Sequence, residues 1–208
     1  MPSIKRLNLQ PTDYDWLRPE ESKRYLKAAE RHYPRWRAFL WTSLRSGLRR
    51  GEVFALQWRD LDFEHRHIHV RHSVFRGKLE ATKSHRKRVV PMSPQLHGAL
   101  ERHAAETHRP RCPWVFPNED GQLAHHLDHV QRPHYGSLKA AGLRRIRFHD
   151  LRHTFASQLV LAGRPLKEVQ ELLGHASIQQ TMRYAHLAQE KMVTAVAALD
   201  DLEIDDDE

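Results

Sequence analysis

Two short segments near the C-terminal end constrain this chain more than any other feature. HDLRHT places His149 and Arg152 three residues apart, and LGHASIQQTMRYAH places Tyr184 nine residues after His175. Side chains at i and i+3 share a helix face, so we expect His149 and Arg152 to lie beneath one phosphate. A phenol is a poor nucleophile at neutral pH, and it needs cations around the phosphate and a neighbour that receives its proton. The two segments therefore predict a helical site in which Tyr184 attacks a phosphate.

The charge of the chain points to a polyanionic partner. It carries 34 Lys and Arg against 26 Asp and Glu, and seven of those acids lie in residues 200–208. The remaining residues carry a net charge of +15, which suggests nucleic acid. Cys112 is the only cysteine, so no intrachain disulfide can form, and we expect a reducing compartment, most simply the cytoplasm. No apolar run approaches the roughly 20 residues that span a bilayer, so we expect no membrane partner.

The hydrophobic periodicity predicts a mainly helical α+β fold. A helix is expected to begin near Leu17 and Pro19, and a capping box of Ser177 and Gln180 predicts a short helix that carries Tyr184. Further helices are expected over residues 36–47, 50–58, 94–106, 129–141, 150–162, 166–173 and 187–199. From residue 65 the period changes to two, which predicts a small three-stranded antiparallel sheet of residues 65–71, 79–82 and 89–90. We expect an N-terminal linker (1–16), one catalytic domain (17–199) and an acidic tail (200–208).

Two other clusters supply groups suited to phosphate chemistry. SGLRRGE places Arg49 after the end of a helix, with Glu52 three residues on. The planar guanidinium of arginine makes two parallel hydrogen bonds to a phosphate, and Glu52 is expected to steady the site. LEATKSHRKRVVPM is predicted to form a hairpin with Lys83 at its turn. Lys83 is our candidate for the acid that protonates the oxygen leaving phosphorus, with Lys78 and Lys87 as rivals.

A zinc site is the main alternative for the HDLRHT segment. His149 and His153 are spaced like the paired ligands of H-E-x-x-H, with Asp150 in place of the glutamate. Asp150 is one methylene shorter than that base, no clear third ligand follows, and Arg152 would place a cation beside the metal. We therefore expect no metal and no cofactor. Two further histidine groups are interpreted as polar surfaces or DNA contacts: His65, His67 and His69, and His125, His126 and His129.

The clusters together resemble the catalytic domain of the tyrosine recombinases, the phage integrase family. The pattern of that family is Arg, Lys, His-x-x-Arg, His or Trp, and Tyr. Residues 17–199 carry it in this order: Arg49, Lys83, His149 with Arg152, His175 and Tyr184. The segments WVFPNEDG and AGL, at residues 114–121 and 141–143, also resemble linking segments of the family.

The resemblance implies site-specific strand exchange in double-stranded DNA through a 3′-phosphotyrosyl intermediate, with self-association into a synaptic tetramer. It implies that Arg49 and Arg152 bind the non-bridging phosphate oxygens with help from His175, and that His149 takes or relays the proton of Tyr184. Family members usually carry an N-terminal helical domain that closes around DNA, and almost nothing precedes the first catalytic helix here. Two alternatives stay open: DNA relaxation like that of a type IB topoisomerase, and a DNA-binding protein that has lost catalysis.

Overall fold

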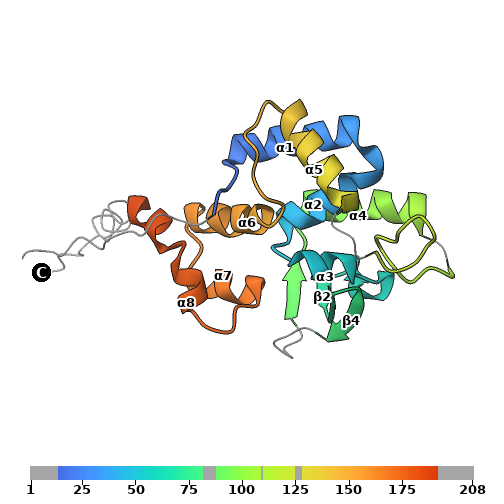
Figure 1. The fold of residues 1–208 in the computed structure, drawn as a ribbon. Helices are drawn as coiled ribbons and strands as arrows, with labels where there is room; N and C mark the ends of the chain where they lie inside the picture. Colours follow the sequence, from blue (N-terminus) through green and yellow to red (C-terminus); the bar gives the residue numbers. More distant parts are fainter. Residues whose placement is uncertain (1–13, 82–87, 109, 125–127, 192–208) are drawn as a thin grey trace, which may run out of the picture.

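A computed structural model describes residues 14–81, 88–108, 110–124 and 128–191 (Figure 1). It is built mainly of helices, with the strands gathered beside α3 and with α7 next to β5, followed by α8 to the left in this view. The α-helices are α1 (Pro19–His32), α2 (Arg37–Arg45), α3 (Arg50–Phe54), α4 (Pro94–Thr107), α5 (Asp128–Ala140), α6 (Asp150–Leu161), α7 (Leu166–Leu173) and α8 (Gln179–Met182). Short 3-10 helices are η1 (Pro34–Trp36), η2 (Trp58–Asp60) and η3 (Ala185–Lys191).

The strands form two small antiparallel sheets rather than one. A three-stranded sheet has the order β1 (Leu61–Asp62), β2 (His67–Val70) and β5 (Arg88–Pro91), and a separate hairpin pairs β3 (His72–Phe75) with β4 (Lys78–Ala81). The α+β class and the three-stranded antiparallel sheet are confirmed. The predicted pairing of residues 79–82 with residues 89–90 is wrong, because β4 pairs with β3 instead. Lys83 lies outside the described residues.

The β3–β4 hairpin depends on a tight two-residue turn. Arg76 and Gly77 both have positive φ, at 48° and 77°. This conformation matches the right-handed twist of the strands and normally favours Asn-Gly or Gly-Gly. The Arg-Gly pair is only a weak turn signal, so the sequence does not predict β3.

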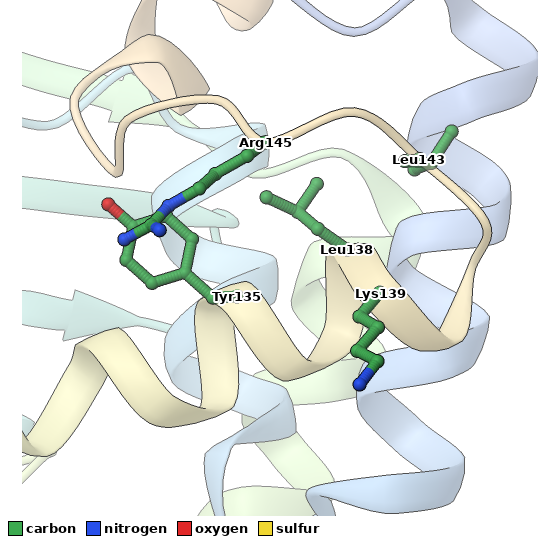
Figure 2. A pocket seen from close by; sticks show the side chains of 5 residues that line it. All are labelled: Tyr135, Leu138, Lys139, Leu143 and Arg145. Carbon is green, nitrogen blue, oxygen red and sulfur yellow. The ribbon is translucent and has the colours of Figure 1, made fainter.

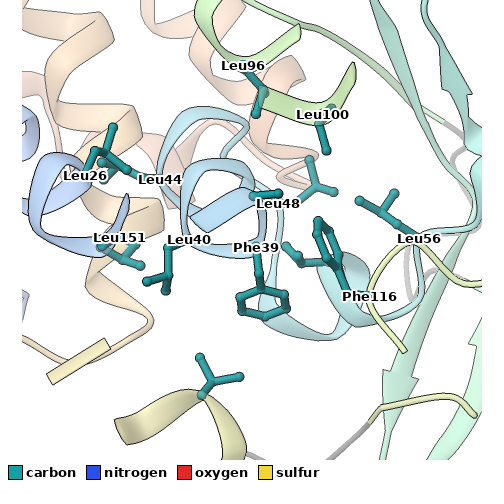
Figure 3. Packing of buried hydrophobic residues seen from close by; sticks show 14 of the residues in the cluster. Leu26, Phe39, Leu40, Leu44, Leu48, Leu56, Leu96, Leu100, Phe116 and Leu151 are labelled. Carbon is teal, nitrogen blue, oxygen red and sulfur yellow. The ribbon is translucent and has the colours of Figure 1, made fainter. Parts of the chain in front are cut away.

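Helix α2 runs through the centre of the hydrophobic core. Phe39, Leu40 and Leu44 of this helix are at most 1% exposed, and they pack with Leu100 of α4 and Leu151 of α6 (Figure 3). This packing fixes α6 against the end of α2. The first residues of α6 and the loop that follows α2 therefore lie close together, which positions the candidate site.

A second, smaller apolar cluster lies on the other face of α6. It contains Tyr14, Ala156, Val160, Val169, Leu173 and Tyr184. Residues from before α1, from α6 and α7, and from the segment after α8 meet in it. The candidate nucleophile Tyr184 is thus part of a packed core rather than of the surface.

Three predicted helices differ from the structure. The helix expected over residues 50–58 ends at Phe54, and η2 follows it after a short gap. Tyr184 lies two residues beyond α8, whose N-cap is Ile178 with no side-chain hydrogen bond, so the predicted Ser177 capping box does not form. Residues 185–191 form a 3-10 helix, and residues 192–208 lie outside the described residues. Among the described helices, none combines the length and the apolarity needed to cross a membrane.

Candidate active site

The C-terminal end of α7 brings three arginines together. The last carbonyls of a helix have no partner within it and carry the negative end of the helix dipole. Each of the three final carbonyls accepts a hydrogen bond from a different arginine: Leu172 from Arg88 Nε (3.0 Å), Leu173 from Arg152 Nη2 (2.7 Å) and Gly174 from Arg49 Nη2 (3.2 Å). Side chains from three distant parts of the sequence thus converge on one helix end.

Gly174 makes this arrangement possible. It ends α7 in the left-handed conformation, with φ 63° and ψ 45°, which glycine adopts without the steric penalty of a Cβ atom. A Cβ atom at this position would lie 3.0 Å from Cδ of Arg88. The glycine therefore ends the helix and leaves room for an arginine beneath it.

Glu52 is the buried counter-ion of the cluster. Its carboxylate accepts two hydrogen bonds from Arg88, from Nη1 at 3.0 Å and Nη2 at 2.6 Å. It also accepts two from Arg49, from Nη1 at 3.1 Å and from the backbone N at 2.7 Å. The side chain is only 1% exposed, and although burial alone would raise its pKa, the hydrogen bonds and charge of Arg88 lower it overall. Glu52 therefore stays ionised and orients both guanidinium groups.

Arg152 is almost fully buried beside this pair. It is 5% exposed, and its Nη1 also donates to the carbonyl of Gly47 at 2.5 Å. Burial and the nearby Arg49 lower the pKa of Arg152 to about 9, so it keeps its charge at neutral pH. Three guanidinium groups then face one carboxylate, which leaves an excess of positive charge suited to an anion.

The two histidines predicted from the sequence border the arginines in different ways. His175 follows Gly174, and its Nδ1 lies 2.8 Å from Oγ1 of the buried Thr181. Burial and the charge of Arg152 lower the pKa of His175 to about 3, so its ring is neutral at physiological pH. When Thr181 donates to Nδ1, Nε2 carries the ring proton and is a hydrogen-bond donor. His149 directly precedes α6 and is exposed, and its pKa is lowered by partial loss of hydration and by Arg152.

An open hollow of about 650 Å³ lies over this cluster. Its walls include Arg49, Glu52 and His149, and the β3–β4 hairpin closes one side with Ser73 and Glu80. Arg49 and Arg50 both line the hollow, which is open to solvent. A phosphate group could reach Arg49 and His149 from outside without displacing a core side chain.

Tyr184 is buried behind the hollow rather than lining it. It is 1% exposed, and its Oη lies 2.7 Å from Nδ1 of His153. Burial raises the pKa of the phenol, an effect that the charge of Arg152 partly opposes. The histidine that contacts the phenol is therefore His153. His149, which the sequence predicts to take or relay the proton, contacts His153 instead, with 5.1 Å between the centres of the two rings.

Three residues of the site were not identified from the sequence. Arg88 lies in a basic stretch that gives no specific signal, although the period-two alternation with Val90 on β5 places both side chains on one face of the strand. The spacing of His153 suggests only a zinc ligand, and Tyr14 lies in the segment predicted to be a linker. Among the described residues, no group of three or more His, Cys, Asp or Glu side chains is placed to hold a metal ion.

A second hollow lies apart from the arginine cluster. It has a volume of about 510 Å³ and is lined by Tyr135, Leu138, Lys139, Leu143 and Arg145 (Figure 2). The guanidinium of Arg145 stacks 4.0 Å from the ring centre of Tyr135. It shares no residue with the site around Glu52.

Comparison with known proteins gives a consistent result. Residues 15–191 match the phage integrase family. The chain is 29% identical over 217 residues to the tyrosine recombinase XerC-like protein of Caldanaerobacter subterraneus subsp. tengcongensis, covering 92% of this chain and 55% of that protein. It superposes on the crystal structure of XerA recombinase with a TM-score of 0.73 and 26% identity, covering 90% of this chain and 66% of that one.

A second similar structure contains DNA. The Tn1549 transposon integrase in complex with a circular intermediate DNA superposes with a TM-score of 0.77 and 24% identity, covering 94% of this chain and 68% of that one. The chain spans about half the length of the curated relatives it matches.

Proposed function

We propose, from the premise that this chain belongs to the phage integrase family, that it cleaves and rejoins duplex DNA at specific sites through a covalent bond to Tyr184. The observation that carries the proposal is the convergence of Arg49, Arg88 and Arg152 on the end of α7, beside the buried phenol. Such a preorganised group of donors stabilises the charge that develops at phosphorus without reorganising during the reaction.

In the proposed reaction, Oη of Tyr184 attacks the scissile phosphorus as the bond to the 5′-oxygen breaks. The products are a 3′-phosphotyrosyl link and a free 5′-hydroxyl. Arg49 and Arg152 hold the non-bridging oxygens, and Nε2 of His175 donates a further hydrogen bond. Lys83 protonates the leaving oxygen, and Glu52 keeps Arg49 in place. A 5′-hydroxyl from a partner strand then attacks the link and restores the phosphodiester, so the phosphotyrosine conserves the energy of the bond.

The buried position of Tyr184 adds a requirement to this scheme. Its phenol must reach the hollow that holds the phosphate, and the segment between His175 and Tyr184 is the connection that allows it. This segment contains only the short helix α8. We therefore propose that DNA binding shifts this segment so that Oη reaches the phosphate while it stays within hydrogen-bond distance of Nδ1 of His153.

We propose duplex DNA as the partner, with several copies of the chain assembling on it as a synaptic tetramer. The basic character of the chain supports DNA binding, as does the solved DNA complex of the similar Tn1549 integrase. A DNA substrate and the single thiol are consistent with a cytoplasmic location. Residues 15–191, matched to the family, form the catalytic unit that we propose, and Tyr14 packs against it.

The test uses a nicked duplex from which the cleaved strand diffuses away, so that the covalent product accumulates. The wild-type chain is expected to form a protein–DNA adduct on a denaturing gel, and Tyr184→Phe should bind DNA equally well but form none. Tyr135→Phe, away from the arginine cluster, is the matched control and should form the adduct at the wild-type rate. An adduct with Tyr184→Phe would assign the nucleophile to another residue. Exchange of strands between two duplexes, rather than relaxation of one, would separate a recombinase from a topoisomerase.

A further inference from the structure

His153 and Tyr184 form a buried pair directly behind the arginine cluster. Nδ1 of the imidazole lies 2.7 Å from Oη of the phenol, and the residues are 6% and 1% exposed. His153 follows Arg152 in α6, so one helix turn delivers a phosphate-binding cation and a ring nitrogen that touches the nucleophile. No other histidine of the described chain makes a hydrogen bond to this phenol.

A second buried histidine–tyrosine pair, His134 with Tyr25, serves as a structural comparison for His153 and Tyr184. Nδ1 of His134 lies 2.9 Å from Oη of Tyr25, and Nε2 lies 3.0 Å from the carbonyl of Ile146. Both ring nitrogens are occupied, and the carbonyl fixes the proton on Nε2. His153 differs, because its Nε2 makes no hydrogen bond with the part of the chain that the structure describes. Its ring is held by Tyr184 and by stacking alone.

We propose that His153 is the base that receives the proton of Tyr184, and that Tyr14 is the residue that positions it. This inference rests on the proposed function. As Oη bonds to phosphorus, the O–H bond of the phenol breaks and an N–H bond forms at Nδ1, which gives an imidazolium ion. When the 3′-phosphotyrosyl link is resolved, Nδ1 returns the proton to Oη. No other reactant is needed.

The surroundings of His153 tie this transfer to the presence of a phosphate. Burial, followed by the charges of neighbouring groups, lowers the pKa of His153 to about 3, while burial raises that of Tyr184, so the proton stays on the phenol in the free protein. The ionisable groups that act on the ring are His149, Arg183, Arg152 and Arg147, together with Tyr14 and Tyr184. A phosphodiester held by Arg152 offsets the charge of that arginine, one of the causes that follow burial, and so raises the pKa of His153. The base therefore becomes effective when the substrate is in place.

Tyr14 holds the imidazole of His153 by stacking on it. Its ring stacks on that of His153, with 4.5 Å between ring centres and an angle of 18° between the planes. Its Oη donates to the backbone carbonyl of Arg183 at 3.2 Å, which ties it to the residue before the nucleophile. The next residues are anchored too, since Asp15 pairs with Arg144 at 2.8 Å and Leu17 N donates to Thr154 Oγ1 at 3.0 Å.

The test compares adduct formation on the nicked duplex by the full chain and by His153→Gln. Glutamine retains a hydrogen bond to the phenol but is not a base. We expect the rate of adduct formation to fall about 100- to 10,000-fold, and to keep rising with pH where the wild-type rate has levelled off. His134→Gln is the matched control, because it alters the other buried pair, and its rate per folded molecule should equal that of the wild type.

Tyr14 is tested by a pair of variants. Tyr14→Phe keeps the stacking and should react within about twofold of the wild type. Tyr14→Ala should react roughly tenfold more slowly, and the pH at which its rate rises should differ from that of the wild type. If Tyr14→Ala lowered the yield of folded protein but left the rate and its pH profile unchanged, the positioning role would be wrong.

The outcomes separate this inference from the proposed function. No adduct from the wild-type chain would overturn both. Equal rates for the wild type and His153→Gln would overturn the role of His153 while the nucleophile stands. A third measurement needs no variant: ¹⁵N NMR of the histidine rings should show Nδ1 of His153 unprotonated in the free protein and protonated in the covalent complex. A proton on Nδ1 in the free protein would show that His153 donates to the phenol and is not its base.

Discussion

Replacing Glu52 by glutamine should destabilise the fold far more than the loss of a surface carboxylate. The carboxylate is 1% exposed and accepts four hydrogen bonds, two from Arg88 and two from Arg49. A glutamine has one acceptor oxygen, and its amide nitrogen would face the donors of an arginine. The positive charge of Arg88, whose side chain is 9% exposed, would then be buried without a counter-ion.

The expected loss in the free energy of unfolding comes mainly from Arg88. Removing one partner of a buried ion pair costs about 3–5 kcal/mol, because the remaining charge is left uncompensated. Arg49 adds little, since its side chain is 42% exposed and water can replace the lost contact. We therefore expect Glu52→Gln to lower the free energy of unfolding by about 3–4 kcal/mol, out of the 5–15 kcal/mol typical of a domain.

Urea unfolding at pH 7, followed by circular dichroism, measures this effect. Glu168→Gln is the control, because Glu168 pairs with Arg164 on the surface, where the side chains are 46% and 56% exposed, and it should lose less than about 1 kcal/mol. A double variant, Glu52→Leu with Arg88→Met, removes both buried charges and should be more stable than Glu52→Gln alone. If Glu52→Gln lost no more stability than Glu168→Gln, the buried ion pair would not be what holds the two guanidinium groups.

Two further predictions concern other parts of the fold. Burial lowers the pKa of His134 from 6.5 to about 4, so the unfolded chain binds a proton before the folded chain does as the pH falls. The contribution of His134 to the free energy of unfolding, about 3 kcal/mol, should therefore be present above pH 6.5 and lost by about pH 4. Urea unfolding at pH 7 and pH 4.5 should show this loss, and His134→Gln should reduce the difference; an unchanged pH dependence in the variant would remove His134 as its cause. Gly136→Ala should lower stability by about 1–3 kcal/mol, because a Cβ atom there would overlap the ring and Oη of Tyr33. Gly98→Ala in α4, with only Arg102 nearby at 3.8 Å, should instead gain about 0.5–1 kcal/mol in the same assay, and equal effects of the two changes would contradict this packing.

The parts of the fold that the sequence predicted well are those with a strong local signal. The helices expected over residues 94–106, 150–162 and 166–173 agree with α4, α6 and α7 to within one residue at each end. Each has a clear start or stop, such as the Ser93 side chain that accepts a hydrogen bond from Leu96 N, or Gly174 in the left-handed conformation. The pairing of β3 with β4 depended on an Arg-Gly turn, and such local signals do not specify which strands share a sheet.

The candidate site also contains some residues that a local sequence signal identifies and others that only the packing brings together. His149 with Arg152, and Gly174 with His175, belong to short motifs and could be identified from spacing alone. The pairs Arg88–Glu52 and His153–Tyr184 join residues 36 and 31 positions apart, and they form only when β5, α3 and α6 are packed together. A sequence shows which groups are available for chemistry, whereas the packing decides which histidine touches the phenol.

The convergence of three guanidinium groups at one point also explains why this region should accept an anion before any chemistry occurs. Like charges at such short range repel one another, and the fold offsets the repulsion with three helix-end carbonyls and one carboxylate. The carbonyls supply only partial charges, so net positive charge remains in the arginine cluster. A bound phosphate removes that residual repulsion, and the same charge change acts on His153, because Arg152 is one of the charges that, after burial, lower the pKa of that histidine. Binding of the substrate and activation of the nucleophile are therefore two consequences of one electrostatic arrangement around the end of α7.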